Sequence, residues 1–192
     1  MTDTPVAAAV LTGGASRRMG RDKALVEVDG AAMVHRVVAA VVGAGCSPVI
    51  TVGGDAAALA TVLADTEADV AMVPDRFPGE GPLGAILTAL RHLASPAVVV
   101  ATDLAWLDAA TVERLLVHRD RLDADVVMAR SDRAEHLCAL WWPSAAPALE
   151  RRFAAGERAI HRALDGLRLV EVAVPTGAVR NVNTPTDLGR TT

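Results

Sequence analysis

One loop near the start of the chain gathers groups that bind phosphate. It reads LTGGASRRMGRDK over residues 11–23 and directly follows the apolar run 6–10. Its adjacent glycines, Gly13 and Gly14, let a backbone approach a ligand closely, because no Cβ blocks the way. Three arginines and Lys23 concentrate positive charge within seven positions of a chain whose formal net charge is −4. This contrast favours a polyphosphate ligand over nucleic acid, because domains that bind nucleic acid more often spread basic residues over a whole face and have a high pI.

The loop matches neither of two common nucleotide-binding fingerprints. A Walker A motif requires Lys and then Ser or Thr directly after Gly20, where Arg21 and Asp22 stand. The dinucleotide fingerprint GxGxxG fails because the glycines at the turn are adjacent and the next one follows six residues later. The spacing therefore indicates neither a P-loop nor a nicotinamide cofactor. A solvated basic loop with turn glycines stays open as the alternative to a polyphosphate site.

Size and composition predict one cytoplasmic domain. The chain has 192 residues, enough for one well-packed domain and few for two, so we expect a single domain over 1–192. Hydrophobic residues make up 52%, but no window approaches the ~20 apolar residues that span a bilayer. Residues 1–5 resemble no targeting leader, and Cys46 and Cys138 lack the spacing of a disulfide framework or a zinc site. We expect reduced core cysteines and no membrane binding.

The pattern of apolar residues is typical of an α/β fold. Short Val- and Ala-rich runs alternate with stretches of helical period, as in a mostly parallel central sheet flanked by helices. The predicted strands are 6–11, 49–52, 70–73, 97–101, 126–129, 137–141 and 169–174. The predicted helices include 31–44, 56–64, a helix that begins near Pro82, a helix around Val112 and most of 144–164. We expect 126–129 and 137–141 to form a hairpin, which would break the purely parallel order.

Three chemically notable segments follow predicted strands. They are the loop 11–23, the segment PDRFPGEGPLG at 74–84, and Asp103 directly after the run 97–101. In open parallel sheets, ligands bind outside the carboxyl ends of the strands, where the connecting loops converge. We therefore expect these segments to lie together, with the polar run 181–184 as a further candidate.

The order of these motifs carries a resemblance to a known family. LTGGxSxRMGxDKxL, then PD followed by GPLG, then an apolar strand that ends in Asp, and finally NVNTP resemble the nucleotidyltransferases that guanylylate molybdenum cofactor. The match covers nearly the whole chain. It implies a Rossmann-like nucleotidyltransferase domain that binds GTP and Mg²⁺ and transfers GMP to the phosphate of molybdopterin, with pyrophosphate as the leaving group. It also implies transient contact with molybdopterin-loading proteins or molybdoenzymes.

The resemblance assigns the nucleotide-binding residues. Small residues and backbone groups of the first loop would admit the base and ribose, and Lys23 would contact the phosphates as a point charge. Asp75 aligns with a nucleotide-contacting acid of the family, although an Asp after a proline also caps turns. Arg17 is a candidate clamp for pyrophosphate, and His136 precedes a strand in the half expected to receive the pterin. The loop residues in this assignment are Leu11, Thr12, Gly13 and Gly14.

The metal site implied by the resemblance rests on Asp103, with Asn183 of NVNTP as a candidate second ligand. Mg²⁺ in proteins takes one or two carboxylates and completes its shell with phosphate oxygens and water, so one Asp is sufficient. The second pKa of a phosphate monoester is about 6, so the attacking oxygen needs alignment more than a general base. Catalysis is therefore assigned to Lys23, Asp103 and Arg17. Asn183 also has a purely structural explanation, as a turn residue before Pro185.

Three departures from the family pattern leave alternatives open. Thr12 stands where Ala is usual, Ala85 follows GPLG where Ala and then Gly are common, and Asp103 lacks the proline that often stands two residues later. A transferase that uses CTP, or one that acts on another phosphorylated small molecule, shares the fold. The first loop of the CTP-using relatives resembles LAAG more than LxGG, so the resemblance at Gly13 favours guanine over cytosine. A non-catalytic nucleotide- or pterin-binding adaptor is the alternative of another class, against which Lys23 and Asp103 together argue.

Overall fold

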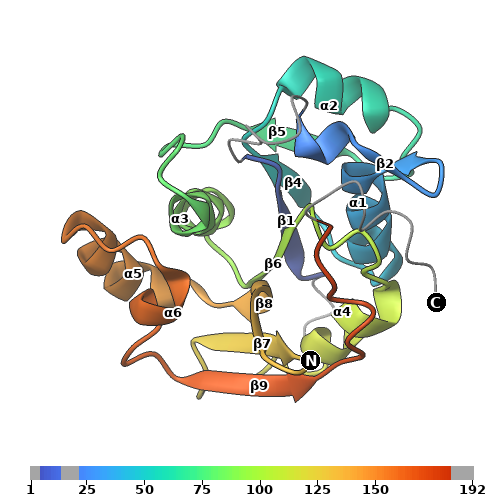
Figure 1. Ribbon diagram of the computed structural model, residues 1–192. Helices are drawn as coiled ribbons and strands as arrows, with labels where there is room; N and C mark the ends of the chain where they lie inside the picture. Colours follow the sequence, from blue (N-terminus) through green and yellow to red (C-terminus); the bar gives the residue numbers. More distant parts are fainter. Residues whose placement is uncertain (1–4, 14–21, 183–192) are drawn as a thin grey trace.

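A seven-stranded sheet forms the centre of the molecule in the computed structural model, which describes residues 5–13 and 22–182 (Figure 1). The strands follow the order β5-β4-β1-β6-β8-β7-β9, and within the described residues β8 alone runs against its neighbours. The predicted mostly parallel α/β fold is confirmed. The strand bounds are β1 (Ala7–Leu11), β4 (Val49–Val52), β5 (Val70–Val73), β6 (Ala97–Ala101), β7 (Val126–Arg130), β8 (Ala134–Trp141) and β9 (Leu169–Ala173).

The central strands β1 and β6 are apolar and buried over their whole length. Such continuous apolar runs are typical of parallel strands that are covered on both faces. The register pairs Leu11, the last residue of β1, with Val52 of β4 on one side and with Ala101 of β6 on the other. Because these strands end level with one another, their following loops all emerge at one edge of the sheet.

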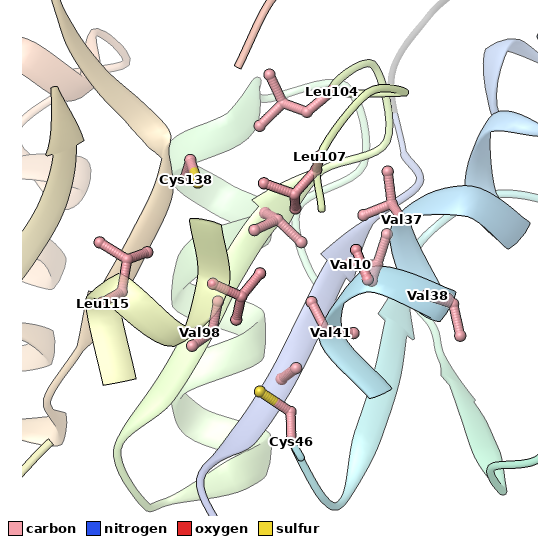
Figure 2. Packing of buried hydrophobic residues seen from close by; sticks show 14 of the residues in the cluster. Val10, Val37, Val38, Val41, Cys46, Val98, Leu104, Leu107, Leu115 and Cys138 are labelled. Atoms are coloured by element: carbon pink, nitrogen blue, oxygen red, sulfur yellow. The ribbon is translucent and has the colours of Figure 1, made fainter. Parts of the chain in front are cut away.

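Helices cover both faces of the sheet (Figure 1). Alternate strand residues point to opposite faces, so Val10 joins one core cluster and Ala9 joins the other. Figure 2 shows the first cluster, in which Val37 and Val41 of one helix and Leu115 of another pack on the sheet. The helices of this face are α1 (Met33–Gly43), α2 (Ala56–Val62) and α4 (Ala109–Leu116); those of the second are α3 (Pro82–Leu93), α5 (Ala146–Ala154) and α6 (Ile160–Ala163).

The predicted hairpin is present, and its turn is tighter than expected. The two strands reach Arg130 and Ala134, which pair directly, so residues 131–133 connect them. The strands predicted from apolar runs were too short, because both observed strands include polar residues next to the turn. A register shift between Met128 and Ala129 accompanies this extension.

The predicted start of one helix was wrong because its first two residues form a short β-strand instead. The predicted helix at 31–44 begins at Met33, since β3 (Ala31–Ala32) pairs with β2 (Glu27–Val28) in a small ribbon. A 3-10 helix (Lys23–Leu25) precedes this ribbon. The stretch 144–164 is mostly helical, as predicted, and divides into a second 3-10 helix (Pro143–Ala145) and the helices α5 and α6.

Both cysteines are buried and reduced, as predicted. Burial raises the pKa of the Cys46 and Cys138 thiols to about 12. Among the described helices, none has the length and apolar character that crossing a bilayer would need.

Candidate active site

The loop after β1 is fastened to the end of β4 by its backbone and by one hydroxyl. The amides of Thr12 and Gly13 both donate to the Val52 carbonyl at 3.0 Å. The Thr12 hydroxyl lies 2.7 Å from the Gly53 carbonyl oxygen, to which it donates. Thr12 is buried and Gly13 is exposed. The surface offered to a ligand is therefore glycine backbone, and the Thr12 side chain that replaces the usual Ala is turned toward β4.

Gly53 allows a close approach that no other residue would permit. Its φ of +77° lies in the left-handed region, and a Cβ built there would stand 2.9 Å from the Gly13 Cα. Contacts under 3.0 Å require the backbone to shift. The segments that follow β1 and β4 therefore come into close contact at Gly13 and Gly53, a contact that we call the glycine crossing. In the sequence, Gly53 is only the residue after the predicted strand 49–52.

Asp75, just after β5, lies beside this glycine crossing. Its Oδ1 accepts hydrogen bonds from the Phe77 amide and the Thr88 hydroxyl, both at 3.0 Å. Its Oδ2 stands 3.9 Å from the place that a Cβ on Gly13 would occupy, and within the described residues it accepts no hydrogen bond. One oxygen therefore caps the turn, as its sequence context suggested, while the other faces the exposed surface of Gly13.

Lys23 and Asp103 meet although 80 positions separate them. Lys23 Nζ lies 3.0 Å from Asp103 Oδ2, and their side chains are 25% and 19% exposed. Lys23 opens the 3-10 helix, whose first turn is capped by Asp22 through the Ala24 amide. Asp103 follows β6, where the Thr102 hydroxyl donates to the Leu11 carbonyl. The structure thus brings together the residue that the resemblance assigns to phosphate contact, Lys23, and the one that it assigns to metal ligation, Asp103.

The second Asp103 oxygen is suited to a divalent cation. Oδ1 is buried, and no described residue donates a hydrogen bond to it. A buried carboxylate oxygen without a partner is unfavourable unless a ligand satisfies it. Within residues 5–13 and 22–182, no group of three or more His, Cys, Asp or Glu could hold a metal ion. A site with one carboxylate, completed by substrate phosphate and water, fits Mg²⁺.

The loop after Asp103 is packed rather than open. Leu104 and Ala105 are 2% and 1% exposed, and the Val182 amide donates to the Asp103 carbonyl at 2.9 Å. The missing proline is therefore replaced by buried side chains that hold this turn. The start of NVNTP lies against it, although Asn183 itself is outside the described residues.

Some of the other residues named from the sequence are buried, and some lie outside the residues that the structure describes. Leu11 is buried and its carbonyl accepts from Thr102, so it supports the loop from beneath. Ala85 is buried on α3 within the second core cluster. Gly14 and Arg17 are outside the described residues, so their roles stay predictions.

Sequence reasoning missed the aromatic clamp on the segment 74–84. The chain's two phenylalanines, Phe77 and Phe153, touch with ring centroids 4.7 Å apart. Arg158 stacks on Phe153 at 3.9 Å and pairs with Glu80 at 2.6 Å. A Cβ on Gly84, the last residue of GPLG, would stand 2.8 Å from the Phe77 Cβ. The scarcity of phenylalanine was the available signal, but their separation along the chain hid the pairing.

A second missed signal concerns Lys23. It is the only lysine in the chain, which contains 18 arginines. Lysine presents a compact charge on a flexible stem, whereas arginine presents a planar fork. The single lysine, in a chain that otherwise uses arginine, was a signal in the sequence that this position differs from the other basic ones.

His136 lies in the other half of the sheet, within β8 rather than before a strand. It is half-buried, and this burial, with His161 nearby, lowers its pKa. It is therefore more readily neutral than an exposed histidine.

Comparisons with known proteins agree with this arrangement. The family model described as MobA-like NTP transferase domain matches residues 8–172. A probable molybdenum cofactor guanylyltransferase from Mycobacterium tuberculosis is 34% identical over 175 residues, which is 86% of this chain and 84% of that protein. Its counterpart from Mycobacterium avium is 31% identical over 189 residues, covering 95% and 93% of the two chains.

Solved structures show the same fold. Molybdopterin-guanine dinucleotide biosynthesis protein A from Archaeoglobus fulgidus is similar with a TM-score of 0.75 and 29% identity over 95% of both chains. Rv0371c from Mycobacterium tuberculosis H37Rv, in complex with manganese, gives a TM-score of 0.72 at 20% identity over 96% of both chains.

Proposed function

This chain belongs to the family of MobA-like NTP transferase domains, and on that premise we propose that it transfers GMP from GTP to the phosphate of molybdopterin. The reaction releases pyrophosphate and forms the guanine dinucleotide form of the molybdenum cofactor. The observation that carries the proposal is the Lys23–Asp103 pair, whose Asp103 follows β6, the strand that pairs with β1 and so ends next to the start of the Gly13 loop. In this proposal the pair would supply a cation and a metal ligand at the edge of the sheet where Gly13 offers a surface without side chains.

The chemistry requires positioned charge more than proton transfer. An oxygen of the acceptor phosphate attacks the α-phosphorus of GTP, while the bond to the bridging oxygen breaks and pyrophosphate leaves with that electron pair. The acceptor phosphate is largely dianionic near neutral pH, so no strong base is needed. Charge that develops on the equatorial and leaving oxygens must be neutralised, and fixed cations do this best in a preorganised site.

The metal half of the site rests on Asp103. Its unsatisfied Oδ1 would ligate the cation, and Mg²⁺ is our specific proposal. When bound, the metal would supply Lewis-acid stabilisation of the phosphate oxygens. Lys23, held at 3.0 Å from Asp103 Oδ2, would contact the polyphosphate as a fixed positive charge. Arg17 and Asn183 complete this half of the proposal.

The nucleotide half rests on the glycine crossing and Asp75. The backbone of Leu11, Thr12, Gly13 and Gly14 would support the base and ribose. Asp75 Oδ2, which faces Gly13, would accept hydrogen bonds from guanine or ribose. The small residue at position 13 favours guanine over cytosine, and family membership favours an enzyme over an adaptor.

A direct assay tests the proposal. The purified protein is incubated with molybdopterin, Mg²⁺ and each nucleoside triphosphate in turn, and pyrophosphate release is followed. We expect release with GTP and its loss when the metal is chelated. Release with CTP alone would reassign the base, and no release with any nucleotide would contradict the enzyme. Transient contact with molybdopterin-loading proteins and a cytoplasmic location belong to the same proposal.

A further inference from the structure

A small third cluster of buried side chains joins the segments that carry Lys23 and Asp103. Its buried members come from β2, the start of α1, the loop after Asp103 and the start of NVNTP: Val28, Met33, Ala105 and Val182. Backbone hydrogen bonds link these segments further. The Val26 amide donates to the Lys23 carbonyl at 3.2 Å, and the Met33 amide donates to the Val26 carbonyl at 2.9 Å.

Arg36 on α1 is the polar group that bridges this cluster. Its Nε donates to the Ala105 carbonyl at 2.7 Å, and its NH1 donates to the Val28 carbonyl at 3.3 Å. Asp29 Oδ2 lies 3.8 Å from the same NH1. Ala105 and Val28 are each 1% exposed. One guanidinium thus joins the residue two positions after Asp103 to the residue five positions after Lys23.

From this geometry we infer that Arg36 is a positioning residue, which sets the distance between the Lys23 ammonium and the Asp103 carboxylate by holding their two segments together. The planar guanidinium presents donors in fixed, divergent directions, so it can satisfy two separate carbonyls at once. Lysine in its place would keep the charge but could not reproduce that fork. The effect on turnover rests on the proposed function, whereas the effect on the ion pair does not.

The ion pair can be followed without substrate because Lys23 is the only lysine in the chain. Trace labelling with acetic anhydride, followed by peptide mass spectrometry, measures the reactivity of its amine against that of the amino terminus. In the wild-type protein, Asp103 shields the amine. We expect Arg36→Met to raise the labelling rate by about tenfold, the factor that corresponds to one lost charged hydrogen bond. Asp103→Asn measures how far labelling rises when the Asp103 charge itself is lost, and Arg36→Lys should fall between wild type and Arg36→Met.

Arg168→Met is the matched control. Arg168 also joins a carboxylate to a backbone carbonyl, those of Asp125 and Leu122, but it lies at the other edge of the sheet. Its loss should leave Lys23 labelling unchanged. Urea denaturation of each variant identifies those that are folded under labelling conditions, and Arg36→Lys provides the comparison if Arg36→Met does not fold.

Two results would overturn the inference. One is wild-type Lys23 labelling in a folded Arg36 variant, and the other is an equal rise in Arg168→Met, which would indicate general loosening. Kinetics add a second readout: kcat for pyrophosphate release should fall about tenfold in Arg36→Met, with KM for the acceptor unchanged. If wild-type protein releases no pyrophosphate, the proposed function fails, but labelling still decides the role of Arg36.

Discussion

Two carboxylates at opposite edges of the sheet differ in how completely their oxygens are used. Asp125, just before β7, accepts hydrogen bonds from Ser144 at 2.7 Å and from the amide, Nε and NH2 of Arg168 at 3.0, 3.0 and 2.8 Å. Asp103, just after β6, pairs with Lys23 through Oδ2, while its buried Oδ1 has no partner among the described residues. The first carboxylate is saturated, and the second can still take a ligand.

This difference distinguishes a carboxylate that holds strands together from one that we propose as a metal ligand. The hydrogen bonds from Arg168 hold the pKa of Asp125 well below its usual range, against the opposing effect of burial. Asp125, just before β7, thereby links this strand to Ser144 after β8 and to Arg168 before β9, and both of its oxygens already accept hydrogen bonds. A buried carboxylate oxygen without a partner is costlier than an unsatisfied hydroxyl or indole, so it calls for a specific explanation such as a bound ion. The open oxygen of Asp103 is therefore the stronger pointer to a binding site.

The largest expected effect follows from removing Asp103. In Asp103→Ala, pyrophosphate release should fall by about 10³-fold, because the proposed metal ligand and the partner of Lys23 are both lost. Stability should change little, since the ion pair is partly exposed and one carboxylate oxygen was unsatisfied. Steady-state kinetics and urea denaturation measure the two quantities. Wild-type rates in this variant would show that Asp103 is not the metal ligand. The proposed functional difference between Asp103 and Asp125 would then be wrong.

Lys23 should show the next largest effect. Lys23→Ala should lower kcat/KM for GTP by about 10²-fold, the range seen when one preorganised donor to developing charge is removed. Lys23→Arg keeps the charge but presents a wider fork, so it should restore activity only in part. Kinetics that match the wild type in both variants would mean that Lys23 is merely solvated and paired.

Sequence reasoning predicted the parts of the fold that rest on long apolar runs. The strands Val49–Val52 and Val70–Val73 were predicted to the residue, because each is a short buried run bounded by turn residues or charge. The two-residue strands Glu27–Val28 and Ala31–Ala32 were missed, since no periodicity can be read from so few positions. Their pairing depends on tertiary contacts with α1 and the loop after Asp103.

The site was predictable where topology alone brings residues together. Lys23 and Asp103 lie in the segments that follow two adjacent, parallel strands, so the rule for carboxyl ends predicts that these segments converge. The contact between the two side chains is an observation of the structure. Arg36 could not be found in this way, because its partners are backbone carbonyls, which no residue type reveals. The clamp of Phe77 by Phe153 likewise depends on how α5 packs on α3, which spacing along the chain does not specify.

The structural half of the comparison predicts a loss of stability without loss of turnover. Asp125→Asn should lower the free energy of unfolding by about 1–2 kcal/mol, since an amide nitrogen would face the donors of Arg168. Its kcat/KM should equal that of the wild type. Asp123→Asn is a matched control from the same loop, because Asp123 pairs with Arg121 on the surface and its side chain is 69% exposed. Equal stability loss in both variants would mean that saturation of Asp125 has no special effect.

The smallest expected effect is the acid dependence of that stability. Because the folded-state pKa of Asp125 lies below its unfolded value of about 3.9, its contribution is present above that value and is lost as the pH falls through it toward the folded pKa. The stability difference between wild type and Asp125→Asn should therefore narrow from pH 6 to about pH 3. Asp123 could also contribute to the pH dependence, because hydrogen bonds from Arg121 lower its pKa to about 2. That pair is exposed, so salt weakens its contribution. Urea titrations at high ionic strength isolate the Asp125 contribution, and a difference that stays constant with pH would exclude a charged Asp125 as its source.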